Sequence, residues 1–366
     1  MKRQEQRLGR RDFVKIMAYG ALGAAALRNR GPILAAKSNC FSSAFFAPGE
    51  PVHQVARHNL YQKIEAPAKV GLVKGDKRYD IVYKSLKLIE DEIIPSIGDK
   101  KIMIKPNVVT PINPLGSLHV DAVRAILDFL APHYKKQIII GEAAVIDTMQ
   151  GYKNYGYLAL EKEYNVKLVD LNLTDSFEYR YVIDKDNKPI PIRILSSFLD
   201  PNIYLISAAP MKTHNIVLVT LSLKNVLLGS PLNDYQNKKN DKGLMHADPN
   251  TTATDICHFN MFHLAQEVFP DLAVVDGFEA MEGKGPAWGT PISARVALAG
   301  RDAVSVDTLA AKVMGFDTKK VLYLHSLAQA GMGQEDLEKI QIIGTPLAEC
   351  LYRFKLDDKT AEIYKI

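Results

Sequence analysis

Residues 101–142 contain the pattern that decides the fold: KIMIKPN at 101–107, VDAVRAILDFL at 120–130 and QIIIGE at 137–142. The first and third stretches are short apolar runs followed by polar residues, which is typical of buried strands. The middle stretch has apolar residues at helical spacing, on one stripe made of Val123, Ile126, Leu127 and Leu130. Strand, helix and strand in this order predict two parallel strands joined by a crossover helix.

The same alternation continues through the rest of the chain. Further strands are predicted at residues 70–73, 167–169, 202–207, 272–275, 296–299 and 340–343, and further helices at 79–94, 158–164, 219–228, 256–268, 303–314 and 321–330. Residues 179–183 and 190–194 predict a β-hairpin. We therefore expect an α/β fold: a mainly parallel sheet with flanking helices and some antiparallel hairpin pairing. One domain is expected over residues 69–366, after a linker or irregular arm at 38–68.

The composition is that of a globular protein, since 47% of the 366 residues are hydrophobic and 24% are charged. Such fractions argue against a disordered or collagen-like chain. The net charge is +5, but residues 1–39 hold nine basic and two acidic residues and contribute +7, which leaves −2 for the rest. Nucleic-acid binding needs a basic face on the folded domain, so none is expected.

Residues 1–37 are predicted to be an export signal. The stretch GRRDFVK at 9–15 precedes a mildly apolar run at 16–27, which is too short to span a bilayer. Two adjacent arginines followed by Phe13 and Lys15 resemble a twin-arginine (Tat) signal. That resemblance implies passage through the Tat export machinery to the periplasm or another extracytoplasmic space, without a stable transmembrane anchor. The alternative is an uncleaved helix lying on a membrane surface.

The chain has three cysteines, Cys40, Cys257 and Cys350, and no C-x-x-C spacing. A Cys-ligated iron–sulfur cluster or a Cys-rich zinc site is therefore not expected. The sequence leaves open whether Cys257 and Cys350 form a disulfide.

Polar residues recur where the predicted strands end, at Lys105, Asn107, Glu142, Asp170, Lys212, His214 and Asp276. In open α/β sheets, ligands bind at the carboxyl ends of the strands. Lys212 and His214 are two residues apart and can reach one pocket. His214 suits a metal ligand or a general base, and Lys212 suits an anion-binding group or a nucleophile. The alternative is a solvated lysine and a histidine that caps the next helix.

Lys224 and Asn225 lie in a predicted helix of leucines and valines. A lysine there must extend to solvent or meet an anion. With Lys105 and Lys212 it would form a cluster that attracts an anion.

Asp276 and Glu282 offer two carboxylates for a hard cation or for acid–base chemistry. Gly283 and Gly285 follow them in a loop whose backbone could approach a ligand closely. The alternative is a tight loop with solvated acids. His246, in the predicted loop at 229–253, is a candidate to join His214 on a metal. Asp307 faces an apolar helix surface and needs a partner, which could be structural or catalytic.

In this order, the motifs resemble the DUF362 family over residues 69–345. They are Lys105-Pro106-Asn107, Gly141-Glu142, Lys212-Thr213-His214, Leu223-Lys224-Asn225, Asp276-Gly277, Met281-Glu282-Gly283 with Gly285-Pro286, and Ala299-Gly300-Arg301-Asp302 through Asp307 to Met314-Gly315-Phe316. The family name itself states that no function is established. Some members carry additional cysteine-rich ferredoxin segments, which this chain lacks.

We expect an exported enzyme that acts on a small anionic substrate with a divalent metal. The candidate catalytic residues are His214, Lys212 and Glu282. The candidate substrate-binding residues are Lys105, Asn107, Lys224, Asn225, Gly283 and Gly285. The candidate metal ligands are His214, His246, Asp276 and Glu282. The alternative is a non-catalytic periplasmic accessory protein that binds a ligand or cofactor, for which the lysines alone would suffice.

Overall fold

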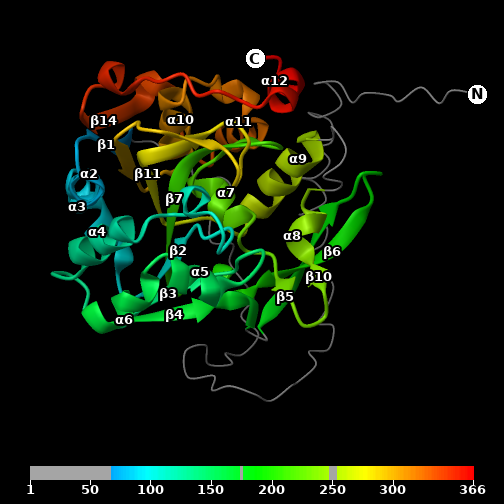
Figure 1. Ribbon diagram of the computed structural model, residues 1–366, viewed down its shortest axis with the longest axis horizontal. Coiled ribbons are helices and arrows are strands. Elements are labelled where there is room, and N and C mark those ends of the chain that lie inside the picture. Colours follow the sequence, from blue (N-terminus) through cyan, green and yellow to red (C-terminus); the bar gives the residue numbers. More distant parts are fainter. Residues whose placement is uncertain (1–66, 174–175, 247–253) are drawn as a thin grey trace, which may run out of the picture. The chain divides into compact units, whose positions relative to one another are not determined.

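The computed structural model describes residues 67–173, 176–246 and 254–366. The predicted export signal, and all but the last two residues of the predicted arm, lie outside the described residues. Within them, a ten-stranded sheet runs through the protein, and helices cover both of its faces (Figure 1). The predicted α/β class with a mainly parallel sheet is therefore confirmed.

The path of the sheet brings distant segments side by side. Its order is β14 (Ile340–Gly344), β1 (Ala68–Lys74), β13 (Val296–Gly300), β11 (Leu272–Glu282), β7 (Ile203–His214), β2 (Lys101–Pro106), β3 (Ile138–Glu142) and β4 (Val166–Asp170). Neighbours are parallel, except that β13 is antiparallel to both β1 and β11. The short strands β8 (Leu218–Thr220) and β12 (Thr290–Ile292) pair antiparallel with the ends of β7 and β11. The carboxyl ends of β2, β3, β7 and β11 therefore meet at one edge.

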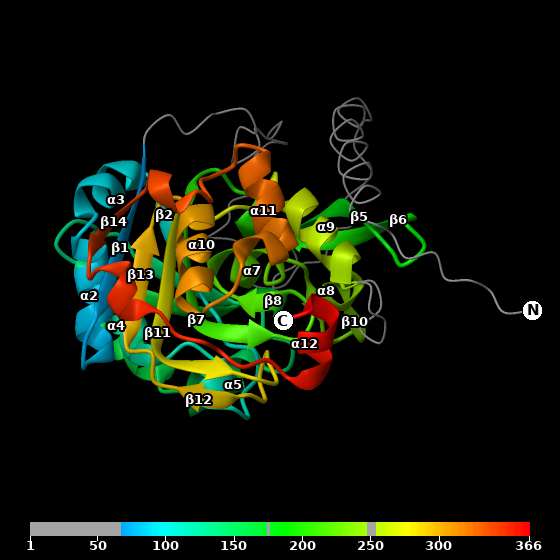
Figure 2. The same ribbon diagram turned by 90° about the horizontal axis from the view of Figure 1, so that it is seen from above.

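Helices pack on the sheet in two layers (Figure 2). One layer holds α2 (Arg78–Lys87), α3 (Glu90–Ile97) and α4 (Val120–Leu130), and the other holds α7 (Ser222–Leu227) and α10 (Ala303–Val313), with α9 (Thr254–Ala265) and α11 (Leu322–Gln329) beyond. Smaller helices are α5 (Thr148–Asn154), α6 (Leu160–Glu163), α8 (Asp241–Leu244) and α12 (Asp358–Tyr364). Two separate ribbons pair β5 (Phe177–Ile183) with β6 (Pro189–Leu195), as predicted, and β9 (Asn233–Asp234) with β10 (Lys239–Asn240).

The helix α4 coincides with its predicted range. His119 caps its first turn by accepting the N–H of Asp121 at 3.2 Å, and the apolar stripe of Val123, Ile126 and Leu130 is fully buried. Burying each such side chain stabilises the fold by about 1.5–3 kcal/mol. This stripe packs in the core cluster between the sheet and the α2–α4 layer.

Three predictions about element bounds are wrong. The helix predicted at 219–228 begins only at Ser222, because Leu218–Thr220 forms the strand β8. The helix predicted over 79–94 is two helices, because Ile89 leaves helical geometry (φ −129°, ψ 22°) where its fully buried side chain enters the core. The strands predicted at 202–207 and 272–275 extend to His214 and Glu282, because β8 and β12 continue the pairing. Lys212, His214 and Asp276 therefore lie within strands and not after them.

Cys257 and Cys350 are both free and buried, so they do not pair. Among the helices of the described ranges, none combines the length and the hydrophobicity needed to cross a membrane.

Candidate functional site

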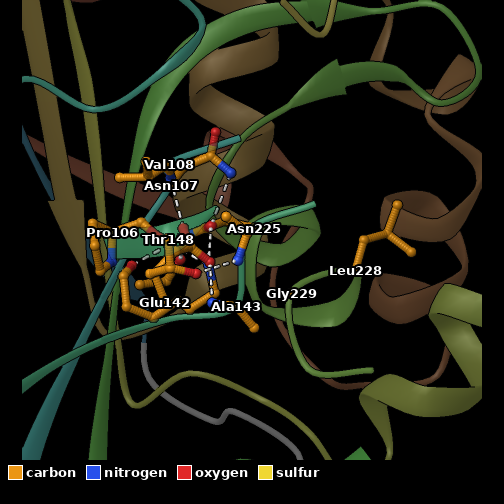
Figure 3. A network of polar contacts seen from close by, with 12 residues as sticks. Pro106, Asn107, Val108, Glu142, Ala143, Thr148, Asn225, Leu228 and Gly229 are labelled. Atoms are coloured by element: carbon orange, nitrogen blue, oxygen red, sulfur yellow. Dashed lines mark hydrogen bonds and ion pairs between the residues drawn. The ribbon is translucent and has the colours of Figure 1, made fainter. Parts of the chain in front are cut away.

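Lys105 is 1% exposed and belongs to a buried polar network at the carboxyl edge of the sheet. Figure 3 shows its partners Pro106, Glu142 and Asn225. Its Nζ forms an ion pair with Glu142, and it donates to the carbonyl of Pro106 at 2.8 Å and to Oδ1 of Asn225 at 3.1 Å. An ammonium group has three N–H donors. All three are used, so the predicted direct contact between Lys105 and a ligand would require this network to open.

Glu142 and Asn225 complete the network. Glu142 also accepts the N–H of Val108 at 2.6 Å and of Ala143 at 2.7 Å. The Asn225 side-chain amide donates to the Lys105 carbonyl at 3.0 Å, and Asn225 Oδ1 accepts from Asn107 at 3.0 Å (Figure 3). Asn107 Oδ1 is buried without a hydrogen-bond partner. The network joins β2, β3 and α7 and leaves one buried acceptor open.

A second group of residues lies at the end of β7, and we name it the lysine–histidine cluster: Lys212, His214, Lys224 and His246. Lys212 is fully buried and donates to the carbonyl of Gly116. Lys224 is 8% exposed, yet its ammonium makes no hydrogen bond or ion pair with any described residue. The charges of Lys212 and Lys224 both act on His214, and Lys224 also acts on His246. The structure therefore brings these four predicted residues together.

Hydrogen bonds set the tautomers of the two imidazoles. His214 Nδ1 accepts the N–H of Ile216 at 3.1 Å and of Val217 at 3.3 Å, so its proton is on Nε2. His246 Nδ1 lies 3.0 Å from the carbonyl of Lys242. A carbonyl only accepts, so this proton is on Nδ1 and Nε2 has a free lone pair. The rings stack with centroids 6.4 Å apart.

Burial and like charges disfavour protonation throughout the cluster. Burial lowers the pKa of Lys224 to about 8 and that of His246 to about 4. Burial, and then the charge of Lys224, hold the pKa values of Lys212 and His214 well below their ordinary values. An anion placed among these groups would oppose both effects and raise their pKa values.

Lys242, which the sequence did not single out, adds a further buried cation nearby. It is 5% exposed and donates to the carbonyls of Leu228 at 3.3 Å and Gly229 at 2.6 Å, just after α7. Burial lowers its pKa to about 7, with the charge of Lys105 acting in the same direction. Lys242 lies in a stretch predicted to be a polar loop, where a lysine gives no signal of burial.

The helix α7, which carries Lys224 and Asn225, is positioned by Asp307 of α10. The Asp307 carboxylate accepts the N–H of Ser222 at 2.9 Å and of Leu223 at 2.8 Å. These are orphan donors at the first turn of the helix. The partner that the sequence required for Asp307 is therefore the backbone of α7.

The four candidate metal ligands do not come together. Asp276 is 3% exposed and pairs with Nε of Arg78 at 3.0 Å. Glu282 accepts the N–H of Lys355, in the C-terminal segment, at 2.9 Å. Within the described ranges, no group of three or more His, Cys, Asp or Glu side chains is arranged to hold a metal ion. The two histidines that do meet share their surroundings with two lysines, whose positive charge disfavours a cation.

Gly283 and Gly285 pack against protein. A Cβ at Gly285 would lie 1.9 Å from the carbonyl oxygen of Thr213, and Gly283 accepts from the Thr213 hydroxyl at 3.0 Å. Gly283 has φ +81°, in the left-handed region that favours glycine. These glycines fit the turn after β11 closely onto the end of β7, beside His214.

The residues that form this site lie in a part of the chain that is similar to known proteins. The model of a family described as a domain of unknown function, DUF362, matches residues 102–312, more than half of the chain.

The chain belongs to the DUF362 family.

The part of the chain that matches this family includes Lys105, Asn107, both lysines and both histidines of the cluster, Asp276 and Glu282. A thylakoid-associated protein of Synechocystis sp. is 22% identical over 238 residues, which cover 64% of this chain and 69% of that protein. A crystal structure of a Thermotoga maritima protein aligns with a TM-score of 0.38 and 12% identity, over 71% of this chain and 59% of that one.

Proposed function

We propose that this DUF362 protein binds a small anionic molecule at the lysine–histidine cluster and catalyses a proton transfer on it. The observation that carries the proposal is the Lys224 ammonium, which is nearly buried and has no partner among the described residues. Leaving a charge buried and unpaired is costly. A bound carboxylate or phosphate would supply the missing partner.

The charge balance around the cluster supports an anionic ligand. Four buried lysines, Lys105, Lys212, Lys224 and Lys242, lie at or beside this edge. Glu142 is the acid that pairs with Lys105, and Lys212 and Lys242 are bonded only to backbone carbonyls among the described residues. The carboxylates of Glu142, Asp170 and Asp241 act on Lys242, but no described carboxylate is bonded to Lys212 or Lys224. These two ammonium groups are therefore left without a carboxylate partner.

The paired histidines support proton transfer. His214 presents an Nε2–H, and His246 presents an Nε2 lone pair; neither atom has a hydrogen-bond partner among the described residues. Because both rings are neutral at neutral pH, His246 can take a proton from a bound molecule at Nε2. His214 can stabilise the charge that develops on that molecule by donating a hydrogen bond from its Nε2–H, without losing its own proton. A protein that only holds an anion would need the lysines but not this pair of tautomers.

The test of anion binding is calorimetric titration of the full chain with sulfate and with inorganic phosphate. We expect Lys224→Met to weaken binding at least about tenfold, because a hydrogen bond to a charged group contributes about 1.5–3 kcal/mol. Lys312→Met, at an exposed lysine of α10, is the matched control and should bind as the parent does. Equal binding by Lys224→Met and the parent would refute the site.

Proton transfer is tested separately, with carboxylated and phosphorylated small molecules that bind. We expect NMR spectra in deuterated water to show exchange of a ligand hydrogen, and His214→Asn and His246→Asn to lose that exchange while retaining affinity. Ligands that bind to the parent protein without exchange or turnover would indicate the non-catalytic accessory protein.

We further propose that the protein is exported by the Tat route, on the strength of Arg10 and Arg11 followed by Phe13 and Lys15. Replacing both arginines by lysine should retain the full chain in the cytoplasm of a Tat-competent bacterium. Unchanged export of that variant would contradict this route.

A further inference from the structure

A pocket of about 240 Å³ opens beside β11, and none of the four cluster residues lines it. Its walls include Arg78, Ser117, His119, Pro210, Asp276 and Glu279. We propose that this pocket, which we name the Arg78 pocket, binds an α-amino acid with a small apolar side chain. The proposal goes beyond the anion site and does not depend on it.

Arg78 provides the recognition group for a carboxylate. Its Nε forms an ion pair with Asp276 Oδ2 at 3.0 Å but is buried without a hydrogen bond to a described residue, and its guanidinium lies over the ring of Phe278, 5.0 Å from the centroid. Asp276 is fixed in turn by the N–H of Phe278 at 2.9 Å. The two terminal nitrogens of Arg78 make no hydrogen bond with any described residue. A guanidinium held in this way presents a planar pair of donors, which matches the two oxygens of a carboxylate.

Two further donors line the same pocket. The Ser117 hydroxyl is buried and has no hydrogen-bond partner in the described part of the chain. His119 accepts the N–H of Asp121 on Nδ1, so when neutral it carries its proton on Nε2. Burial, and then the charge of Arg78, lower the pKa of His119, which keeps it neutral at neutral pH.

The charges of the pocket favour a zwitterion over a simple anion. Arg78 and Asp276 neutralise each other, and the exposed Glu279 leaves an excess negative charge. A ligand with a carboxylate and no positive group would be repelled by the negative charge of Glu279. An α-amino acid can place its carboxylate on Arg78 and its ammonium toward Glu279, which satisfies both charges.

The volume of the pocket and its remaining walls determine which amino-acid side chain the ligand can carry. A volume of 240 Å³ is the volume that about eight molecules occupy in liquid water, at ~30 Å³ each. Pro114, Leu115, Pro210 and Pro291 provide apolar wall. These features suit an aliphatic side chain of a few carbons, as in alanine, proline or valine.

The test uses three probes that share a four-carbon isobutyl framework: L-valine, isovalerate, which lacks the ammonium, and isobutylamine, which lacks the carboxylate. We expect calorimetry on the full chain to show valine binding, with both other probes at least tenfold weaker. Arg78→Lys, which keeps a positive charge beside Asp276, should weaken valine binding at least tenfold. Glu279→Gln should weaken valine binding and leave isovalerate binding unchanged or stronger.

Controls separate this site from folding defects and from the anion site. Lys77→Gln changes an exposed neighbour of Arg78 outside the pocket lining and should bind valine normally, as should Lys224→Met. Ser117→Ala, a minimal change, should weaken valine binding even if Arg78→Lys fails to fold. The proposal is wrong if alanine, proline and valine all fail to bind at millimolar concentration, or if a folded Arg78→Lys protein binds valine as the parent does.

Discussion

His214 and His246 stack with ring centroids 6.4 Å apart and an interplanar angle of 17°, and they carry their protons on different nitrogens. Backbone groups choose both tautomers, since two N–H groups donate to one ring and a carbonyl accepts from the other. The pair is therefore set before any ligand arrives. Such preorganisation is what acid–base catalysis needs, because no reorientation precedes the proton transfer.

The tautomers themselves can be measured. We expect nitrogen-detected NMR to show both rings neutral at pH 7, with His214 protonated on Nε2 and His246 on Nδ1. His246 should protonate only near pH 4, in line with its lowered pKa of about 4, and a bound anion should raise that value. A His246 that titrates near pH 6.5 would show that its site is open to water.

The affinity for sulfate should depend on pH through the lysines. Sulfate keeps its charge between pH 6 and 10, and Lys224 has a pKa of about 8 in the free protein. Binding favours the charged lysine, so the part of the affinity that Lys224 contributes should be level below about pH 8 and fall by up to tenfold per pH unit above it. Calorimetry in buffers of different ionisation enthalpy should show proton uptake on binding.

Lys242, with a pKa of about 7, and Lys212 titrate in the same experiment. The contribution of Lys224 is the part that disappears in Lys224→Met. If sulfate binding causes the same proton uptake in the parent protein and in Lys224→Met, the pH dependence comes from Lys242 and Lys212 and not from Lys224.

Removing the unpaired charge should stabilise the fold. The fall of the Lys224 pKa from 10.5 to about 8 corresponds to a cost on the order of 3 kcal/mol at pH 7. Lys224→Met should therefore have a higher free energy of unfolding at pH 7. The gain should shrink as pH rises from about 8 toward 10.5, where the folded lysine is neutral and the unfolded one is still charged. Denaturant titrations at pH 7 and 9.5 check this, with Lys312→Met as the reference.

Breaking the central ion pair should have the opposite effect. Glu142→Gln leaves the ammonium of Lys105, which is 1% exposed, without its counter-charge, and we expect a loss of about 3–5 kcal/mol of stability. Glu90→Gln, at the surface pair with Lys87, should cost no more than about 1 kcal/mol. Chemical denaturation of both variants measures these two losses of stability. If Glu142→Gln loses as little stability as Glu90→Gln, water must reach Lys105.

Metal removal should not affect anion binding. The predicted ligands Asp276 and Glu282 are engaged with Arg78 and with the backbone of Lys355. Treatment with EDTA is therefore expected to leave the sulfate affinity unchanged. A loss that added Zn²⁺ or Mg²⁺ restores would show that a metal links the histidines to the anion.

The sequence predicted local features well because their causes are local. The range of α4 follows from its apolar stripe and the capping His119, and both lie within a dozen residues. The ends of β7 and β11 were missed because the strands that extend them are short. Most of β8 falls within the apolar run that predicted a helix at 219–228, and β12 has three residues, one of them a proline.

Within the candidate site, the sequence indicated which residues gather at the sheet edge, but not which of them are partners. Lys105 was grouped with the other lysines as an anion binder, whereas the structure pairs it with Glu142. Asp276 was grouped with Glu282, whereas its partner is Arg78, almost 200 residues earlier. Partner choice depends on how helices dock on the sheet, and periodicity carries no information about that.

The support of α7 from both ends has an evolutionary consequence. Asp307 bonds to its first turn and Lys242 to the carbonyls just after its last. In a helix, each inserted or deleted residue rotates the following side chains by about 100°. A single-residue insertion before Lys224 would turn its ammonium away from the histidines while both ends stayed anchored. Related chains should therefore tolerate substitutions between residues 222 and 227 more readily than changes in the number of residues there.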